Sequence, residues 1–408
     1  MVTKTQAIQL LQDMIQINTE NQNEASLASY LKDVLSRYGI ESTLVEFAPN
    51  RSSLVAEISN GPGKKLGLTG HLDVVSAGKA ADWTHPPFSG FIDDNNILWG
   101  RGASDMKSGL AALILAMISL HESRQYSGTI RLLATVGEEV GEYGSKQLTE
   151  LGYADDLDGI LIGEPCNIGV IYAHKGSLNY KVTSKGTAAH SSMPELGTNA
   201  IEHLNQAMIK ISDAVAQEAA KHTDSELGQT LHNITLISGG QQVNSIPDLA
   251  SFEANARTIP SFNNEDVITL VKQILDELNH QEGFDLSIEV TADQKPVVSD
   301  KNSALIQSIL KVNQQFPSLQ VSAQLEQMKL VLGYDLSEQV DLPIDLVPLA
   351  VSGTTDAAQF TKSGKNFDLA VYGPGIPVLN HKIDERLPID QYWDFIAIYQ
   401  AIISDYLS

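Results

Sequence analysis

The stretch Trp99–Gly109, WGRGASDMKSG, places one carboxylate, Asp105, between a glycine-rich turn and the start of a helix. From Met106 the chain continues MKSGLAALILAMISLHES, which is apolar on all sides, so we expect a buried helix of about four turns. The free backbone N–H groups at the start of a helix favour a carboxylate there. Taken alone, Asp105 is best interpreted as a helix cap. Its neighbours in the sequence change that interpretation.

Working outward from this helix, β-type runs alternate with helical patterns, and polar groups follow the strands. His71-Leu72-Asp73 follows the run that begins at Lys65, Gly137-Glu138-Glu139 follows Thr129–Val136, and Gly163-Glu164 follows Gly159–Ile162. Strands that alternate with helices and end in polar residues indicate an α/β fold with a site along one edge of the sheet.

The pattern changes near residue 176. A strand, a helix, two strands, a helix and a final strand follow one another, which is the order of a ferredoxin-like α+β domain. We therefore predict an inserted domain at residues 177–293 and a first domain made of residues 1–176 and 294–408. A chain of 408 residues is long enough for two hydrophobic cores.

Composition and charge exclude several classes of protein. The net charge of −23 leaves no basic stripe for nucleic acid or for an anionic membrane surface. Cys166 is the only cysteine, which excludes an intrachain disulfide and a thiolate metal cage; we expect it to be buried. The N-terminal residues are typical of an amphipathic helix rather than of a signal peptide, so the expected location is the cytoplasm.

The polar groups at the predicted strand ends share the chemistry of metal ligands. Imidazole nitrogens and carboxylate oxygens suit hard or borderline divalent ions, and two ions can share one bridging carboxylate. The candidate groups are numerous enough for two ions: His71, Asp73, Asp105, Glu138, Glu139, Glu164 and, in Asn380-His381 near the C-terminus, His381. Any one of them alone is more often a surface or structural residue. That interpretation holds for seven further histidines: His85, His121, His174, His203, His222, His232 and His280.

Spacing within two of these motifs suggests separate roles. In His71-x-Asp73, an extended backbone places both side chains on one face, so Asp73 can orient the imidazole. Adjacent carboxylates such as Glu138 and Glu139 point apart, so one can bind a metal ion while the other accepts a proton. A general base beside a metal site is what metal-assisted hydrolysis requires.

Six motifs together resemble one known family. GHLDVV (70–75), GRGASDMKSGLAA (100–112), GEE (137–139), GEP (163–165), GTAAHSSMPELGTNAI (186–201) and Asn380-His381 look like motifs of the co-catalytic zinc deacylases and exopeptidases. This family includes succinyl-diaminopimelate desuccinylase, acetylornithine deacetylase, aminoacylase and glutamate carboxypeptidase. The likeness covers almost the whole chain. It implies a zinc-exopeptidase-like catalytic domain, with a mixed sheet flanked by helices, and an inserted lid and dimerisation domain.

The resemblance also implies roles for individual residues. Asp105 would bridge two divalent metal ions, zinc first, with cobalt or manganese also suited. The remaining ligands would be His71 and Glu164 for one ion and Glu139 and His381 for the other. Glu138 would be the general base and Asp73 the partner of His71. The peptide bond between Asp105 and Met106 would be cis.

Substrate-binding roles follow from the same resemblance. His190 would reach the active site of the partner subunit of a homodimer and help stabilise the oxyanion. Asn244 and Arg257 match positions that hold a substrate carboxylate, and Gly353 and Thr354 match a backbone-rich substrate loop.

These roles predict hydrolysis of the amide bond of a small N-acyl amino acid. Our leading interpretation is an N-succinyl-LL-diaminopimelate desuccinylase of lysine biosynthesis; acetylornithine deacetylase, aminoacylase and dipeptidase remain open. Many desuccinylases have an Arg soon after the Asp of the substrate loop, where this chain has Asp356-Ala357-Ala358. That difference weakens, without excluding, the prediction of a succinyl substrate, since no guanidinium is there to bind its second carboxylate. Lys175, Lys329 or Arg257 could replace the missing group.

Two other classes of protein fit the sequence less well. A metal-binding protein without activity would lack a ligand or the base, and none is missing. A serine or nucleotide enzyme would carry a Gly-x-Ser-x-Gly, GxxxxGK[ST] or GxGxxG motif, and the sequence has none of them.

Overall fold

The computed structural model describes residues 2–20, 22–339 and 342–408 and divides into two compact units. The first unit comprises Met1–Tyr172, Ser299–Leu349 and Thr355–Ser408, and the second comprises Ala173–Val298 and Ala350–Thr354. The second unit thus begins and ends a few residues outside the predicted domain 177–293. It also includes a short stretch, Ala350–Thr354, which lies within the predicted first domain, residues 294–408.

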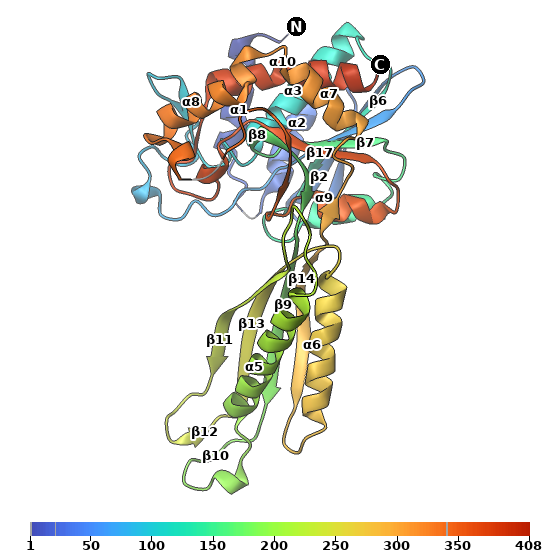
Figure 1. The fold of residues 1–408 in the computed structure, drawn as a ribbon. Coiled ribbons are helices and arrows are strands. Elements are labelled where there is room, and N and C mark those ends of the chain that lie inside the picture. The colour runs from blue at the N-terminus through green and yellow to red at the C-terminus, as the bar shows by residue number, and fades with distance from the viewer. Residues whose placement is uncertain (1, 21, 340–341) are drawn as a thin grey trace. The chain divides into compact units, whose positions relative to one another are not determined.

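A mixed nine-stranded sheet forms the centre of the first unit, although β15 and the last residues of β8 and β16 belong to the second unit (Figure 1). Its strand order is β1-β2-β6-β3-β7-β17-β8-β15, and β16 pairs with β8. The central strands β6, β3, β7 and β17 are parallel, and β1–β2, β2–β6, β17–β8 and β8–β15 are antiparallel pairs. This confirms the predicted α/β class with a mixed sheet. The strands are β1 (Ser42–Ala48), β2 (Arg51–Asn60), β3 (Lys65–His71), β6 (Gly128–Thr135), β7 (Gly159–Ile162), β8 (Cys166–His174), β15 (Val297–Val298), β16 (Pro348–Val351) and β17 (Asp368–Gly373).

Helices flank this sheet, as predicted. The apolar run after Asp105 forms α3, which is buried along most of its length and packs against α10, α1 and β3. None of the helices in the described part of the chain combines the length and apolarity that a membrane crossing requires. The helices of the unit are α1 (Lys4–Gln16), α2 (Glu24–Arg37), α3 (Lys107–Ser123), α4 (Tyr143–Glu150), α7 (Ala304–Asn313), α8 (Val321–Leu332), α9 (Ala357–Phe360) and α10 (Ile389–Tyr406).

A glycine lets α3 approach the edge of the sheet. A Cβ atom added to Gly109 would lie 1.8 Å from the carbonyl oxygen of Gly163, which directly follows β7. Because only glycine fits there, the first turn of α3 lies against the carboxyl end of β7. The N-cap position of α3 is Met106, and it makes no side-chain capping hydrogen bond. Asp105 precedes this position, so its carboxylate is directed elsewhere and does not act as the N-cap.

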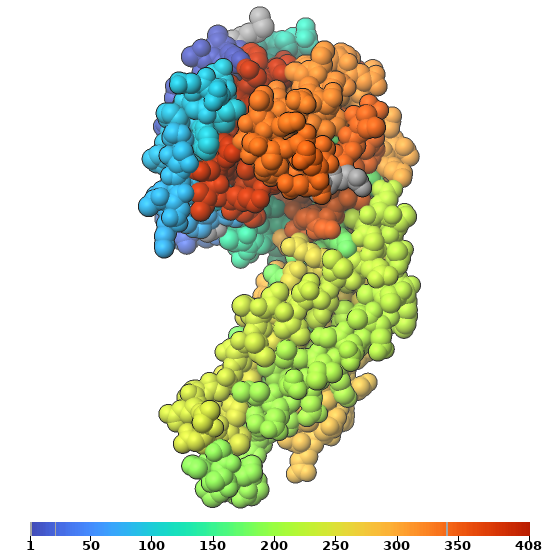
Figure 2. Space-filling model, turned by 60° about the vertical axis from the view of Figure 1, so that its left-hand side comes forward, coloured from blue at the N-terminus to red at the C-terminus, as the bar shows by residue number. Residues whose placement is uncertain are grey.

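A small three-stranded sheet joins two distant parts of the first unit. Its order is β18-β5-β4, with β4 at Phe91–Ile92, β5 at Ile97–Trp99 and β18 at Arg386–Pro388. In Figure 2 the light-blue loop that contains β4 and β5 lies beside the red segment that contains β18. The segment that carries Asp105 and the one that carries His381 therefore meet at this small sheet.

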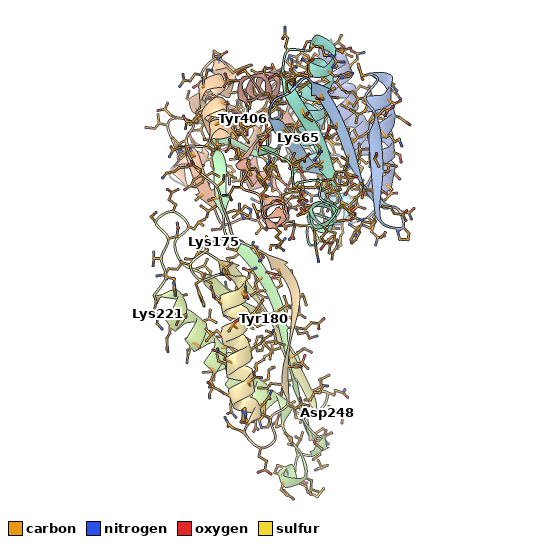
Figure 3. The ribbon with its side chains drawn as sticks, turned by 90° about the vertical axis from the view of Figure 1, so that its right-hand side faces the viewer. Lys65, Lys175, Tyr180, Lys221, Asp248 and Tyr406 are labelled. Atoms are coloured by element: carbon orange, nitrogen blue, oxygen red, sulfur yellow. The ribbon has the colours of Figure 1, made fainter. Side chains whose placement is uncertain are left out.

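The second unit has the predicted ferredoxin-like topology. Its four-stranded antiparallel sheet has the order β11-β13-β9-β14, and α5 and α6 pack on it. Tyr180, labelled in Figure 3, is one of the buried residues of this core. The elements are β9 (Gly176–Lys185), β10 (Ala189–His190), α5 (Ala200–Ala219), β11 (Leu231–Gly239), β12 (Ser245–Ile246), β13 (Leu249–Thr258), α6 (Asn264–Asn279) and β14 (Leu286–Gln294).

Candidate metal centre

All four parallel strands of the first unit lead into candidate ligands at the same edge of the sheet. His71 is the last residue of β3; Glu138 and Glu139 follow β6, Glu164 follows β7, and His381 comes after β17. The carboxyl ends of parallel strands meet at one edge, so residues that are far apart in the sequence converge there. Asp105 is added from the segment that leads into α3, and its peptide bond to Met106 is cis, as the resemblance implied.

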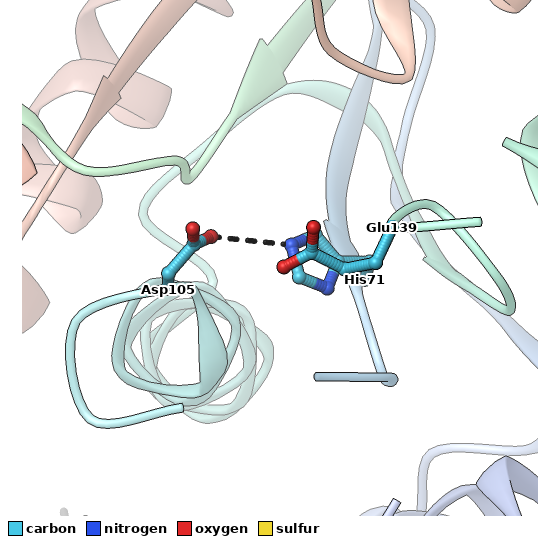
Figure 4. Close-up of side chains that lie close together, drawn as sticks. All are labelled: His71, Asp105 and Glu139. Atoms are coloured by element: carbon cyan, nitrogen blue, oxygen red, sulfur yellow. Dashed lines mark ion pairs between the residues drawn. The ribbon is translucent and has the colours of Figure 1, made fainter. Parts of the chain in front are cut away.

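Asp105 lies between two histidines. Its Oδ1 atom is 3.4 Å from Nε2 of His71, and its Oδ2 atom is 3.4 Å from Nε2 of His381. Figure 4 shows Asp105 facing His71, with Glu139 close by. Nε2 of His71 is also 3.4 Å from Oε1 of Glu164, and Nε2 of His381 is 3.1 Å from Oε2 of Glu139. The structure therefore brings the five predicted ligands together as two sets that share one carboxylate.

The donor atoms of these sets fit divalent metal ions. Nε2 of His71 and Oε1 of Glu139 are buried and have no hydrogen-bond partner among the described residues. Buried polar atoms without hydrogen-bond partners are rare in proteins, and a bound ion would explain both of these. Ligand atoms of His71, Asp105 and Glu139 lie within 4.8 Å of one another, as do those of His71, Glu138 and Glu164. Imidazole nitrogen with carboxylate oxygen is a common donor set for zinc.

The electrostatics of the cluster favour a bound cation. Burial raises the pKa of Glu164 to about 8, and the neighbouring Asp105 carboxylate adds to this effect. Burial also raises the pKa of Glu138 well above its ordinary value, against the opposing effect of His71. The pKa of His381 rises to about 10 because its imidazole hydrogen-bonds with the carboxylates of Asp105 and Glu139. Crowded, buried carboxylates hold protons when nothing else balances their charge, and divalent ions supply that balance.

Asp73 supports the centre in two ways. Its Oδ1 and Oδ2 atoms accept the backbone N–H groups of Glu138 and Glu139, both at 3.1 Å. Its backbone carbonyl oxygen is 2.8 Å from Nδ1 of His71. We expected the carboxylate to orient the imidazole, and the contact differs: Oδ1 lies 3.8 Å from Nδ1. The main chain of Asp73 thus fixes the ring of His71, while its side chain fixes the turn that carries the two glutamates.

The remaining predicted residues lie in the second unit. His190 is exposed on β10, with Nδ1 at 2.8 Å from Oγ of Ser192. Asn244 is its neighbour, because the carbonyl oxygen of Asn244 accepts the N–H of Ser191 at 3.1 Å. Arg257 lies near the opposite end of the ten-residue β13, about 25 Å away along the strand. The second unit therefore brings His190 and Asn244 together and separates them from Arg257.

The substrate loop and the proposed replacement cations have other surroundings. Gly353 is exposed and Thr354 is half-buried, and both belong to the stretch Ala350–Thr354. Nζ of Lys175 donates to the carbonyl oxygen of Gln229, and Nζ of Lys329 pairs with Asp335 at 3.1 Å. Each lysine thus already has a partner within its own unit.

Asp356 is a residue whose contribution the sequence did not reveal. Its buried carboxylate accepts hydrogen bonds from Oγ1 of Thr135, at the end of β6, and from Oγ of Ser145 in α4. These contacts hold both sides of the turn that carries Glu138 and Glu139. No local pattern signals this role, because the partners lie about two hundred residues earlier. The following Ala357 and Ala358 are fully buried and supply no cation.

Comparisons with known proteins agree with this architecture. The profile of the Peptidase family M20/M25/M40 matches residues 67–405. A "Probable succinyl-diaminopimelate desuccinylase" of Staphylococcus aureus strain N315 is 38% identical over 99% of this chain and 98% of the relative. A succinyl-diaminopimelate desuccinylase of Ehrlichia canis strain Jake is 26% identical over 98% of both chains.

The fold is shared with solved structures. The M20 family metallo-carboxypeptidase Sso-CP2 from Sulfolobus solfataricus superposes with a TM-score of 0.74 at 18% identity, covering 100% of this chain and 99% of the other. Since the family profile and the Staphylococcus relative each extend over most of the sequence, the protein is a metal-dependent hydrolase and belongs to the Peptidase family M20/M25/M40.

Proposed function

We propose that this protein hydrolyses the amide bond of a small N-acyl amino acid, with N-succinyl-LL-diaminopimelate as the first substrate to test. The observation that carries the proposal is the position of Asp105, whose two oxygens face two histidines that each have a glutamate of their own. Two hydrolytic metal ions held close together can share one carboxylate, and Asp105 is placed to be shared in this way.

The ligand assignment follows the two sets. His71, Glu164 and Asp105 would hold one ion, and His381, Glu139 and Asp105 the other. When bound, two divalent ions polarise the carbonyl group of the substrate and make water more acidic. Zinc is the first choice for this donor set, and cobalt or manganese also suit it.

Glu138 is the proposed general base. Its carboxylate lies near His71 and Glu164. It is not one of the two glutamates that pair with a histidine, which are Glu164 and Glu139. It would take a proton from the attacking water and then deliver it to the amine that leaves. Asp73 keeps Glu138 in place through the hydrogen bond to its backbone N–H. Burial raises the pKa of Glu138, and a raised pKa suits a carboxylate that takes up a proton and later returns it.

The second unit would complete the site as a lid and dimerisation domain. In this proposal His190 of the partner subunit stabilises the oxyanion, and Asn244 and Arg257 bind a substrate carboxylate, with Gly353 and Thr354 lining the substrate loop. The exposure of His190 and Asn244, side by side, supports a role that needs a second chain. Light scattering tests this part: a monomer at assay concentrations contradicts a role for His190 in the partner's site.

The succinyl substrate rests on the names of the Staphylococcus and Ehrlichia relatives. Ala357 and Ala358 stand where many desuccinylases have an arginine, and they offer no cation to a succinyl carboxylate. Acetylornithine deacetylase, aminoacylase and dipeptidase activities are therefore included in the same test. The assay is a panel of succinyl amides, acetyl amides and dipeptides with the zinc-loaded protein.

The variant Glu138→Gln tests the mechanism. We expect its turnover to fall roughly a hundredfold or more, with the metal content unchanged, because the base is lost and the ligands are not. Turnover equal to that of the wild type would contradict the role of Glu138. Two bound ions with no hydrolysis of any amide in the panel would instead favour an inactive metal-binding protein.

A further inference from the structure

The buried carboxylate of Glu385, which is not one of the proposed ligands, accepts several backbone hydrogen bonds from the segment around Asp105. Oε1 of Glu385 accepts the N–H groups of Gly102 at 3.1 Å, Ser104 at 2.8 Å and Asp105 at 2.9 Å. The side chain of Glu385 is fully buried. Three N–H donors that converge on one oxygen are best satisfied by an anion, since charge-assisted hydrogen bonds are about twice as strong as neutral ones.

The other oxygen of Glu385 is bound as well. Nη1 of Arg101 donates to Oε2 at 2.6 Å, and Nη2 of the same guanidinium donates to the carbonyl oxygen of Ser76 at 3.2 Å. The guanidinium lies 5.2 Å from the ring of Trp83. The charge of Glu385 is therefore balanced by the buried guanidinium of Arg101, which is itself held by Ser76 and packed near Trp83.

Glu385 also belongs to the segment of His381. It lies four positions after His381 in the sequence. The backbone carbonyl of Glu385 accepts the N–H of Gly100 at 2.9 Å. Directly before it, Asp384 accepts two hydrogen bonds from Thr84, both at 2.7 Å. The next residues form β18, which pairs with β5. The segment that carries His381 is thus joined to the segment that carries Asp105 through Glu385 and also through Ser104, whose Oγ atom accepts the N–H of Ile376 at 2.8 Å.

We propose that Glu385 is a positioning residue of the metal centre: it fixes the main chain of Asp105 relative to His381, so that the shared carboxylate is in place before any ion binds. The proposal rests on the proposed ligand roles of Asp105 and His381. Residues that hold metal ligands in position commonly matter for affinity almost as much as the ligands themselves.

The first experiment uses the metal-free full-length protein and needs no activity. Hydrogen exchange is compared between the wild type and Glu385→Gln. The N–H groups of Gly102, Ser104 and Asp105 should exchange roughly tenfold faster or more in the variant, because each loses an ionic acceptor. Peptides from the far end of the sheet, around Lys65, should exchange as in the wild type.

The second experiment measures Co²⁺ binding, by its visible absorption spectrum and by competition with a chelator. We expect Glu385→Gln to weaken Co²⁺ binding by roughly 10–100-fold and to change the spectrum. Glu385→Asp, which keeps the charge on a shorter side chain, should recover part of the affinity. In assays at saturating Co²⁺, kcat should fall more than KM changes, since the substrate contacts are untouched.

Asp158→Asn is the matched control. Asp158 also accepts a backbone N–H, that of Lys65 at 2.8 Å, but at the opposite end of β3 from His71. Figure 3 shows Lys65 there, with Tyr406 nearby. The control should lower thermal stability without changing Co²⁺ affinity or the spectrum.

The outcomes separate this proposal from the proposed function. Unchanged exchange at Gly102, Ser104 and Asp105 in Glu385→Gln overturns the anchoring of the loop. Faster exchange with wild-type Co²⁺ affinity overturns the link to the metal centre. A wild-type protein that binds no Co²⁺ contradicts the proposed ligands, and the exchange data still decide whether Glu385 holds the loop.

Discussion

The carboxylate of Asp73 accepts the backbone N–H of Glu138 at 3.1 Å, and so it connects the strand that ends at His71 with the turn that carries the proposed base. The second oxygen makes the same contact with Glu139. A single carboxylate thus sets the positions of two neighbouring glutamates whose side chains have different proposed roles.

The variant Asp73→Asn tests this connection. An amide offers one oxygen, so its NH₂ group would face the N–H of either Glu138 or Glu139 and displace the turn. We expect kcat to fall roughly 10–100-fold, with a smaller loss of metal affinity. Steady-state kinetics and elemental analysis measure the two effects. Asp158→Asn, the same change far from the site, should leave both unchanged; equal kcat in the two variants would contradict the assignment.

Asp356 predicts a stability effect. Asp356→Ala removes the carboxylate acceptor of the buried hydroxyls of Thr135 and Ser145, which keep only the carbonyl oxygens of Gly70 at 3.4 Å and Glu142 at 3.1 Å. With the cavity left by the side chain, we expect a loss of about 2–4 kcal/mol in the free energy of unfolding. Chemical denaturation measures this loss. Ser145→Ala serves as the control, because the double variant should lose less than the sum of the single losses if the two side chains share the hydrogen bond. Strict additivity would argue against that coupling.

The variant Gly109→Ala changes the stability of the protein in two opposite ways, through helix propensity and through a clash with the backbone. Alanine favours a helix by about 1 kcal/mol over glycine. The added Cβ would, however, lie 1.8 Å from the backbone oxygen of Gly163, which no side-chain rotation can relieve. We expect the clash to dominate, with a net destabilisation of about 1–3 kcal/mol and weaker metal binding because α3 is displaced. Thermal unfolding and metal titration measure both. Ser123→Ala, at the exposed end of the same helix, should change neither.

His174 predicts a pH dependence of stability. Burial lowers the pKa of this histidine from 6.5 to about 4, so the folded protein keeps it neutral. Unfolded chains take up a proton below about pH 6.5. The stabilisation is therefore complete above that pH and decreases as the pH falls toward 4, by about 3 kcal/mol at most.

The measurement compares melting temperatures of metal-free wild type and His174→Asn between pH 7.5 and pH 5. An asparagine amide can still donate to the carbonyl oxygen of Lys175, as Nδ1 of the histidine does. The variant should lose less stability on acidification than the wild type. His280→Asn, at an exposed position, should behave as the wild type does; a pH response in His174→Asn as large as in the wild type would refute the assignment.

Sequence reasoning succeeded where short motifs carry chemistry. Positions at strand ends and before the apolar helix predicted a cluster of candidate ligands, and the family resemblance assigned the ligand roles within it. The structure brings the five assigned side chains together: His71, Asp105, Glu139, Glu164 and His381. The mixed sheet and the ferredoxin-like unit were also predicted, since strand and helix periodicities are strong in both. The roles of His190, Asn244, Arg257, Gly353 and Thr354 stay predictions.

Other elements carried too weak a local signal. The short helix α4 buries only Gly144, Ser145 and Leu148, so its apolar face is hardly visible in the sequence. Strand β8 and helix α8 were also not predicted. Asp356 and Glu385 could not be identified as supporting residues, because their hydrogen-bond partners lie more than two hundred residues earlier in the chain. Such contacts become visible only in the folded chain.

The shared position of Asp105 has a consequence for any one-ion form of this centre. Because each of its oxygens faces a different histidine, a substitution there removes a ligand from both sets at once. Glu164 and Glu139 each belong to one set only. If the proposed ligand roles hold, loss or exchange of a single ion is therefore accessible through substitution of either glutamate, whereas substitution of Asp105 would affect both proposed sites at once.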